Sequence, residues 1–219
     1  MASKILFLRH GITEGNKNRW FYGGLNLHLL PEGIENLNQK KASGYYPEIP
    51  DNAQYFTTGL IRTEETLETL FGKKVHETIP ELREMEFGEY EGRTFQDLEN
   101  DPLFQNWTYD ETGDVAFPGG ETRNQFAQRI IQGKEILLGK HKLKELEVRH
   151  NGKDAFTVMI CHGGVIASLI HDMFPGERES MWDWITEPGG GYLVEMGPHG
   201  PMTNKQLGDI IYYYPREDE

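Results

Sequence analysis

Two short apolar runs in the sequence each end in a histidine that is followed by glycine. The first run, Ile5 to Leu8, leads into Arg9-His10-Gly11. The second run, Phe156 to Ile160, leads into Cys161-His162-Gly163. Runs of this length and composition are typical of buried strands. We therefore expect both imidazoles at the carboxyl edge of one sheet, which is where open α/β sheets bind ligands.

An imidazole beside an arginine suits attack on, or clamping of, a phosphoryl group. A neutral imidazole with an ordinary pKa of about 6.5 is available as a nucleophile near neutral pH. Guanidinium groups match the geometry of phosphate and keep their charge at any working pH. Attack by His10 on phosphorus would give a phosphohistidine and would divide hydrolysis into two easier steps.

Four segments, in this order along the chain, resemble the histidine phosphatase superfamily, the phosphoglycerate-mutase-like proteins. They are Leu8-Arg9-His10-Gly11 with Thr13 and Asn16, Arg62 within 60–66, Glu84 within 82–88, and His162 within 161–164. Together they span about positions 5 to 195. The match of four ordered segments is much more specific than Arg-His-Gly alone.

The resemblance implies a role for each of the central residues. His10 is the expected nucleophile, and Arg9 and Arg62 are the expected clamp on the equatorial phosphoryl oxygens. His162 is expected to pair with His10 and, as a cation, to stabilise charge on the transferring group. We assign the neighbouring Cys161 to packing, because a buried free cysteine behaves as a small hydrophobe.

The leaving alkoxide needs a protonated carboxyl group, and the same carboxylate can then activate water. Several glutamates crowd the segment around position 84, so the chemistry alone does not choose among them. By its position after Leu82-Arg83, Glu84 matches the proton donor of the family. Glu86 is the fallback.

Accessory phosphate contacts are implied at Thr13, Asn16 and the backbone near Gly23. The following stretch departs from the family pattern. Relatives commonly carry an aspartate and then Pro-Leu-Thr, whereas this chain reads Asn-Leu-His-Leu-Leu-Pro over 26–31. Gly23 is therefore the least supported of the site residues.

Charge and composition exclude several classes of protein. The chain has 219 residues, with 22 basic against 35 acidic residues and a formal net charge of −13. A nucleic-acid partner calls for a basic surface, so we expect none. No apolar stretch approaches the roughly 18 residues that span a bilayer, so no membrane association is expected. A phosphate site must be a local basic pocket within an acidic shell.

The single cysteine excludes an internal disulfide framework and is typical of a reducing compartment. The first four residues run directly into the first predicted strand, which leaves no room for a signal peptide. We therefore expect a cytoplasmic protein. Nothing in the sequence indicates its oligomeric state.

The apolar pattern alternates between strands and helices. Predicted strands cover 5–8, 54–57, 156–160, 192–196 and 209–214. Predicted helices cover 31–46, 60–71, a long segment that follows a capping box at 122–125, and 165–170. Such alternation predicts an α/β fold with three layers, α/β/α, around a mostly parallel, doubly wound sheet. The length fits one domain over 1–219.

Positions 86–120 break this pattern and predict a small cap insertion. They hold many acids and seven aromatics, among them Phe104 and Trp107, before Pro118-Gly119-Gly120. Long stretches without clear periodicity are often lids. The aromatics either line a substrate pocket or form a small core of their own beneath the loop.

Three functions fit these residues. Between Met85 and Gly120 the chain has one basic residue, Arg93, against nine acids, so a second anionic group would find little support there. Hydrolysis of a small phosphate monoester is thus the expected reaction, most like broad-specificity and α-ribazole phosphatases. A phosphoglycerate-mutase-type transferase and a non-catalytic phosphate-binding module are the alternatives. No histidine spacing indicates a metal site, and we expect no cofactor.

Overall fold

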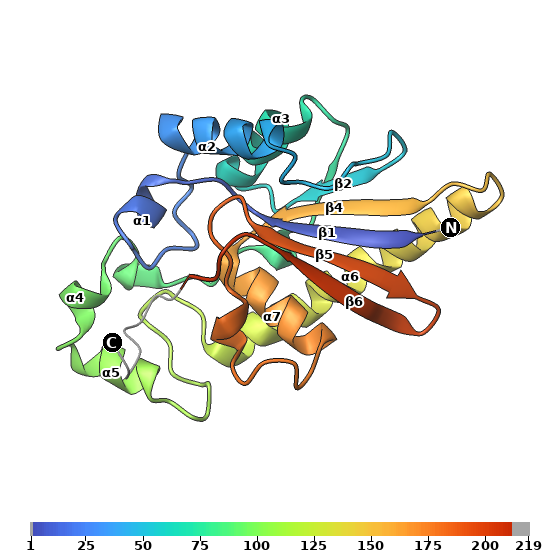
Figure 1. Ribbon diagram of the computed structural model, residues 1–219. Coiled ribbons are helices and arrows are strands. Elements are labelled where there is room, and N and C mark those ends of the chain that lie inside the picture. The colour runs from blue at the N-terminus through green and yellow to red at the C-terminus, as the bar shows by residue number, and fades with distance from the viewer. Residues whose placement is uncertain (1, 212–219) are drawn as a thin grey trace.

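A six-stranded sheet forms the centre of the computed structural model, which describes residues 2–211 (Figure 1). Its strand order is β3-β2-β4-β1-β5-β6. The strands are β1 (Ser3–Arg9), β2 (Gln54–Thr57), β3 (Glu77–Thr78), β4 (Ala155–Cys161), β5 (Gly191–Gly197) and β6 (Gly200–Leu207). The pairs β3–β2, β2–β4 and β4–β1 are parallel, whereas β5 is antiparallel to β1 and to β6. The predicted α/β class is confirmed, with a mixed sheet.

Helices cover both faces of this sheet (Figure 1). The longer helices are α2 (Pro31–Ala42) and α3 (Ile61–Phe71) on one face, and α6 (Arg123–Arg149) and α7 (Gly163–Met173) on the other. Successive side chains of β1 point to opposite faces of the sheet, as in any pleated strand. Ile5 and Phe7 pack into the core that contains Ile166, and Leu6 and Leu8 pack into the core that contains Leu37.

Local sequence signals explain several helix ends. Thr122 caps α6 through a capping box with Gln125, as the sequence predicts. Gly72 ends α3 with φ +73°, a conformation that glycine adopts without strain. The helix predicted for 31–46 is shorter and stops at Ala42, because Ser43 caps it and Gly44 turns the chain with φ +74°.

The last predicted strand, 209–214, is wrong for its described part. Residues 209–211 contribute only an isolated bridge between Ile210 and Thr186, and residues 212–214 lie outside the described residues. The final strand is instead β6, which pairs with β5. In β6 only Leu207 is buried, so this edge strand lacks the apolar alternation that reveals strands in a sequence.

The segment predicted as a cap contains short elements and lies on the side of the sheet where β1 and β4 end (Figure 1). These elements are η2 (Gly88–Tyr90), α4 (Phe95–Leu98) and α5 (Pro102–Thr108). Its aromatics pack on one another: Trp107 lies 5.1 Å from Phe117 and 6.0 Å from Phe104 between ring centroids. All three are at most 3% exposed. These three aromatics are thus core side chains, continuous with the core that contains Ile166, whereas Tyr109 is exposed.

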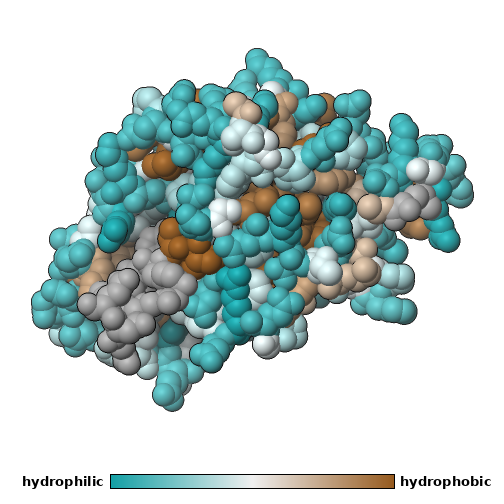
Figure 2. Space-filling view, in the orientation of Figure 1, coloured by the Kyte–Doolittle hydropathy of each residue, from teal (hydrophilic) through white to brown (hydrophobic). Residues whose placement is uncertain are grey.

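The remaining short elements are α1 (Glu14–Lys17), η1 (Pro80–Leu82) and η3 (Met181–Trp184). Figure 2 shows a mostly hydrophilic face, with hydrophobic residues gathered near its centre over the strands. Within residues 2–211, no helix is both long and apolar enough to cross a bilayer.

Candidate active site

The register of β1 and β4 brings the two histidines together. Arg9 pairs with Cys161 at the end of the parallel ladder. The residues that follow them, His10 and His162, therefore lie side by side at the same edge of the sheet. The backbone N–H of His10 donates to the Cys161 carbonyl at 3.1 Å. The rings of His10 and His162 lie 5.3 Å apart between centroids, at an angle of 61°. The sequence-based expectation for this pair thus agrees with the geometry.

A backbone contact fixes the tautomer of His10. Its Nδ1 lies 2.8 Å from the carbonyl oxygen of Gly11. A carbonyl can only accept, so Nδ1 carries the proton and Nε2 keeps its lone pair. His10 is 3% exposed. The ring is therefore held with Nε2 as its nucleophilic atom.

His162 is bound on both ring nitrogens. Arg62 donates from Nε to Nδ1 at 3.3 Å, and the Oγ1 of Thr58 lies 2.9 Å from Nε2. Since Nδ1 accepts, the proton is on Nε2 and the ring is neutral. Burial and the facing guanidinium of Arg62 both disfavour a positive charge on this ring. The expectation that His162 stabilises charge on the transferring group as a cation stays a prediction.

Burial and positive neighbours lower the pKa of both histidines. For His10 and His162 burial is the largest cause, followed by the charge of Arg62. Arg9 also lowers the pKa of each ring. All these causes disfavour the imidazolium form. Both rings are thus neutral at neutral pH.

The two arginines come from different elements and are almost fully buried. Arg62, in the first turn of α3, donates to the carbonyl of Leu25 at 2.7 Å and to that of Gly23 at 3.0 Å. With the bond to His162, these contacts use three of the five N–H groups of a guanidinium. Arg9, at the end of β1, donates to the carbonyl of Thr186 at 2.7 Å. Both charges border the paired imidazoles.

The geometry favours Glu84 over Glu86. The carboxylate of Glu84 accepts the N–H of Gly164 at 2.9 Å, in the first turn of α7 and two residues after His162. A Cβ at position 164 would lie 2.7 Å from Glu84 Oε1, so glycine permits the approach. Glu86 is exposed. Only Glu84 reaches the edge where the histidines lie.

Thr13 and Asn16 form the capping box of α1. The amide oxygen of Asn16 accepts the N–H of Thr13 at 3.0 Å and its hydroxyl at 3.1 Å, which fixes the orientation of the amide. The amide nitrogen of Asn16 is buried and has no hydrogen-bond partner within residues 2–211. A buried donor of this kind calls for an acceptor. A phosphate oxygen would satisfy it.

Gly23 is placed differently from the expectation. Its N–H donates to the carboxylate of Glu91 at 3.1 Å, and the N–H groups of Gly24 and Leu25 donate to the same carboxylate at 2.6 Å each. A side chain at position 23 would overlap the carbonyl of Met85. The Gly23 amide is thus occupied by an internal carboxylate.

Sequence reasoning missed Tyr22 as part of the site. Its hydroxyl lies 2.7 Å from the Oγ1 of Thr13, and the guanidinium of Arg62 lies 5.1 Å from its ring centroid. The ring also meets His10 edge-on at 6.4 Å. The sequence carries no signal for this role, since the close contact of the Tyr22 ring with Gly15, which leaves no room for a Cβ, appears only in the structure.

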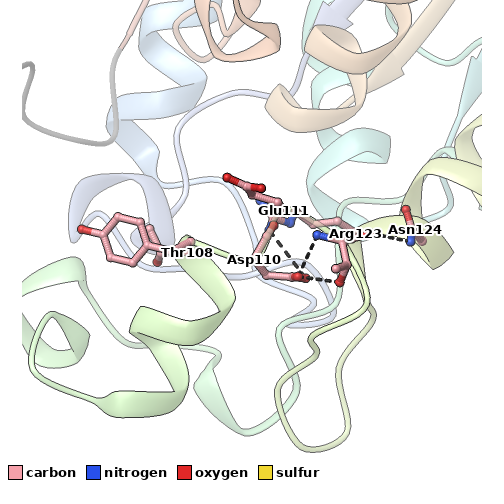
Figure 3. A pocket seen from close by; sticks show the side chains of 8 residues that line it. Thr108, Asp110, Glu111, Arg123 and Asn124 are labelled. Atoms are coloured by element: carbon pink, nitrogen blue, oxygen red, sulfur yellow. Dashed lines mark hydrogen bonds and ion pairs between the residues drawn. The ribbon is translucent and has the colours of Figure 1, made fainter.

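Other features lie outside this cluster. Cys161 is fully buried, and burial raises the pKa of its thiol. Within the described residues, no group of three or more His, Cys, Asp or Glu side chains is arranged to hold a metal ion. An open cavity of about 630 Å³ lies in the cap between the end of α5 and the start of α6 (Figure 3). In this cavity Arg123 Nη2 forms an ion pair with Asp110 Oδ2 at 3.7 Å. None of the predicted site residues lines the cavity.

The chain belongs to the histidine phosphatase superfamily (branch 1), whose model matches residues 5–206. It is 24% identical to a 2,3-bisphosphoglycerate-dependent phosphoglycerate mutase of Parvibaculum lavamentivorans, over 94% of this chain and 97% of that protein. It is 26% identical to the adenosylcobalamin/alpha-ribazole phosphatase of Escherichia coli K12, over 85% and 86% of the two chains.

Solved structures share the fold. An Escherichia coli K-12 protein assigned as an alpha-ribazole-5'-P phosphatase superposes with a TM-score of 0.74 at 22% identity, covering 95% of this chain and 97% of that chain. A phosphoglycerate mutase from Thermus thermophilus gives a TM-score of 0.63 at 25% identity, covering 94% and 98%. The superfamily contains both phosphatases and mutases, and a phosphohistidine mechanism is typical of it.

Proposed function

We propose that the chain hydrolyses phosphate monoesters through a phosphohistidine on His10, without a metal ion. The observation that carries this proposal is the pair of buried, neutral imidazoles at 5.3 Å with a guanidinium against them. A neutral His10 with its proton fixed on Nδ1 supplies a lone pair on Nε2 for attack on phosphorus. The surrounding positive charge favours binding of a phosphate dianion.

In the first half-reaction, Nε2 of His10 forms a bond to phosphorus while the bond from phosphorus to the ester oxygen breaks. Arg9, the two remaining N–H groups of Arg62 and the amide of Asn16 hold the equatorial oxygens. Glu84 gives its proton to the departing alkoxide, which leaves as an alcohol. His162 lies beside His10, and a bound dianion would raise its pKa toward the cation.

In the second half-reaction, Glu84 acts as a base. Its carboxylate takes a proton from water while the water oxygen attacks phosphorus of the phosphohistidine. The bond from phosphorus to His10 breaks, inorganic phosphate leaves, and both residues return to their starting forms. One carboxyl group thus serves both steps, as microscopic reversibility allows.

Two features of the cap support hydrolysis over phosphoryl transfer between two positions of a bisphosphorylated species. Arg93, its one basic residue, stacks over the ring of Tyr90 at 5.3 Å. Glu91 occupies the amides of residues 23–25 and would repel a second anion there. An acidic cap suits a substrate with one phosphate and a neutral or cationic remainder, as in the reaction that an α-ribazole phosphatase is named for.

The proposal is tested by hydrolysis of p-nitrophenyl phosphate in EDTA, with wild type beside His10→Ala. We expect wild type to turn over and the variant to lose more than about 10³-fold in kcat. A phosphate-ester panel then compares monophosphates with bisphosphorylated sugars and glycerates. A higher kcat/KM for the bisphosphorylated compounds would contradict the preference for a monoester.

The mutase is the second candidate, because a relative of that activity aligns over 94% of this chain. Interconversion of 2- and 3-phosphoglycerate in the presence of the bisphosphate would support it. Stoichiometric binding of a phosphoester without turnover would instead support a phosphate-binding module.

A further inference from the structure

The segment that carries Glu84 has no helix or strand of its own. It lies between η1, which ends at Leu82, and η2, which begins at Gly88. Its carboxylate nevertheless meets the N–H of Gly164 from another part of the chain. An irregular segment needs tertiary contacts to hold one conformation, because it lacks the hydrogen-bond ladder of a regular element. The structure supplies them from α6 and from Glu121, which precedes this helix.

Arg129 of α6 binds the backbone of this segment. Its Nη1 donates to the carbonyls of Glu81 and Arg83, both at 2.8 Å, and its Nη2 donates to the carbonyl of Glu84 at 3.2 Å. Its Nε and Nη2 donate to the two carboxylate oxygens of Glu121 at 2.8 and 2.7 Å. These contacts use all five N–H groups of the guanidinium.

Glu121 holds the other side of Glu84. Its carboxylate accepts the N–H of Glu86 at 3.1 Å, and its own N–H donates to the Glu86 carbonyl at 2.8 Å. The side chains of Arg129 and Glu121 are only 23% and 17% exposed. A bidentate pair of this kind is geometrically specific, since guanidinium and carboxylate are both planar. The backbone is thus fixed on both sides of Glu84.

The packing of α6 makes this contact possible. Gly133 lies one turn after Arg129 on the same face of the helix. A Cβ there would lie 2.6 Å from the Leu82 side chain, so glycine lets α6 approach η1 closely. Neither Arg129 nor Glu121 is among the residues that the proposed chemistry uses.

We propose that Arg129 and Glu121 are positioning residues that hold Glu84 where it can protonate the leaving group. The inference rests on the proposed function, in which Glu84 is the proton donor. A proton donor must lie within hydrogen-bond distance of the oxygen that it protonates, so a small displacement of its backbone lowers the rate. Lysine cannot replace Arg129, because its three donors have no fixed fork.

The test compares leaving groups that need a proton with leaving groups that do not. An alkyl phosphate such as glycerol 2-phosphate expels a strongly basic alkoxide, whereas p-nitrophenyl phosphate expels a stabilised phenolate. We expect Arg129→Lys to lower kcat/KM about 10- to 100-fold for the alkyl ester and less than about threefold for the aryl ester. Glu121→Gln should shift the same ratio in the same direction, and it carries the test if the arginine variant does not fold.

Two reference variants frame the result. Glu84→Gln should show the same dependence on the leaving group, and Arg123→Lys, a matched change on α6 at the distant pair with Asp110, should keep the wild-type ratio. Equal losses on both esters in Arg129→Lys and Glu121→Gln, beside a selective loss in Glu84→Gln, would overturn the positioning role alone. Equal losses in Glu84→Gln would overturn the proton-donor role and the inference with it. A wild type without turnover would overturn the proposed function itself.

Discussion

His10 and His162 are kept neutral by burial and by the guanidinium groups that we propose as the phosphate clamp. Removing a histidine from water disfavours its charged form, and the nearby guanidinium groups disfavour it further. The nucleophile therefore needs no separate base to remove a proton from Nε2. The site prepares His10 for attack before any phosphate arrives.

The value of kcat/KM should consequently stay constant as the pH is lowered to about 6.5. Because the pKa of His10 is well below its ordinary value, protonation of the ring should not reduce kcat/KM near pH 6.5. We expect the acid limb of the profile of log kcat/KM to lie clearly below about pH 6.5, after correction for ionisation of the substrate. An acid limb with an apparent pKa at or above that value would contradict the assigned environment.

Asn16 should contribute through the two N–H groups of its unpartnered amide nitrogen. Asn16→Asp replaces the buried amide nitrogen with an oxygen and adds a negative charge, so the phosphate loses a donor and gains a repulsion. We expect kcat/KM to fall about 100-fold. Asn18→Asp, two residues away and exposed, is the control. Equal activity of the two variants would exclude Asn16 from the phosphate site.

The sequence was informative for residues whose roles depend on local context. His10, His162 and Arg9 end buried strands, so their meeting follows from a parallel register. Arg129 and Glu91 gave no such signal. Arg129 binds backbone carbonyls 45 to 48 positions away, and Glu91 binds backbone N–H groups 66 to 68 positions away. In a sequence, a charged residue with such distant backbone partners resembles a solvated surface charge.

At the scale of elements, the loop 23–25 connects the cap to the site. Its amides bind Glu91, and its carbonyls bind Arg62. Glu91 also accepts the N–H of Phe87 at 3.3 Å. The Glu91 carboxylate thus joins this loop to the start of the cap. The loop in turn binds Arg62, which donates a hydrogen bond to His162.

Glu91→Gln should therefore affect both stability and activity. The amide NH₂ of glutamine cannot accept, so at least one backbone N–H, such as that of the exposed Leu25, loses its partner, at a cost of about 0.5–1.5 kcal/mol. Arg62 should lose its fixed orientation, with a fall of about tenfold in kcat/KM. Urea unfolding and steady-state kinetics measure the two effects. Glu89→Gln, an exposed neighbour, should change neither, and identical behaviour of the two variants would contradict this role of Glu91.

Elements with a strong apolar period were predicted well, whereas elements that depend on their partners were not. The buried strand β4 and the capped helix α6 have clear local signals. Strand β6 is mostly exposed and is held by its antiparallel pairing with β5. Backbone pairing of this kind leaves no apolar pattern in the sequence. In the cap, the aromatic composition fitted either a pocket lining or a small core. The ring contacts of Phe104, Trp107 and Phe117, which place these three side chains in a core, follow from the tertiary structure alone.

For the whole molecule, burial of neutral histidines links stability to pH. His141 lies between the Thr157 and Ser3 hydroxyls, at 2.7 Å from each, and burial lowers its pKa as it does for His10 and His162. The unfolded chain binds protons on these rings below about pH 6.5, and the folded chain does not. Their contribution is present above that pH and is lost as the pH falls.

The free energy of unfolding should therefore decrease between pH 7 and about pH 5. Urea unfolding at several pH values measures it. A free energy of unfolding that stays constant or increases as the pH falls over this range would contradict the lowered pKa values of the three rings. Cytoplasmic location and the absence of a cofactor stay predictions at this scale, and the sequence does not address the oligomeric state.

The measurement that tests the central claim most directly is trapping of the phosphoenzyme. Wild type is mixed with a phosphate monoester that carries labelled phosphorus, quenched rapidly in alkali and digested, and the labelled peptide is sequenced by mass spectrometry. We predict label on His10 that is stable in alkali and lost in acid, and no label in His10→Ala. Turnover of wild type with no labelled intermediate, or label on another residue, would contradict nucleophilic attack by His10.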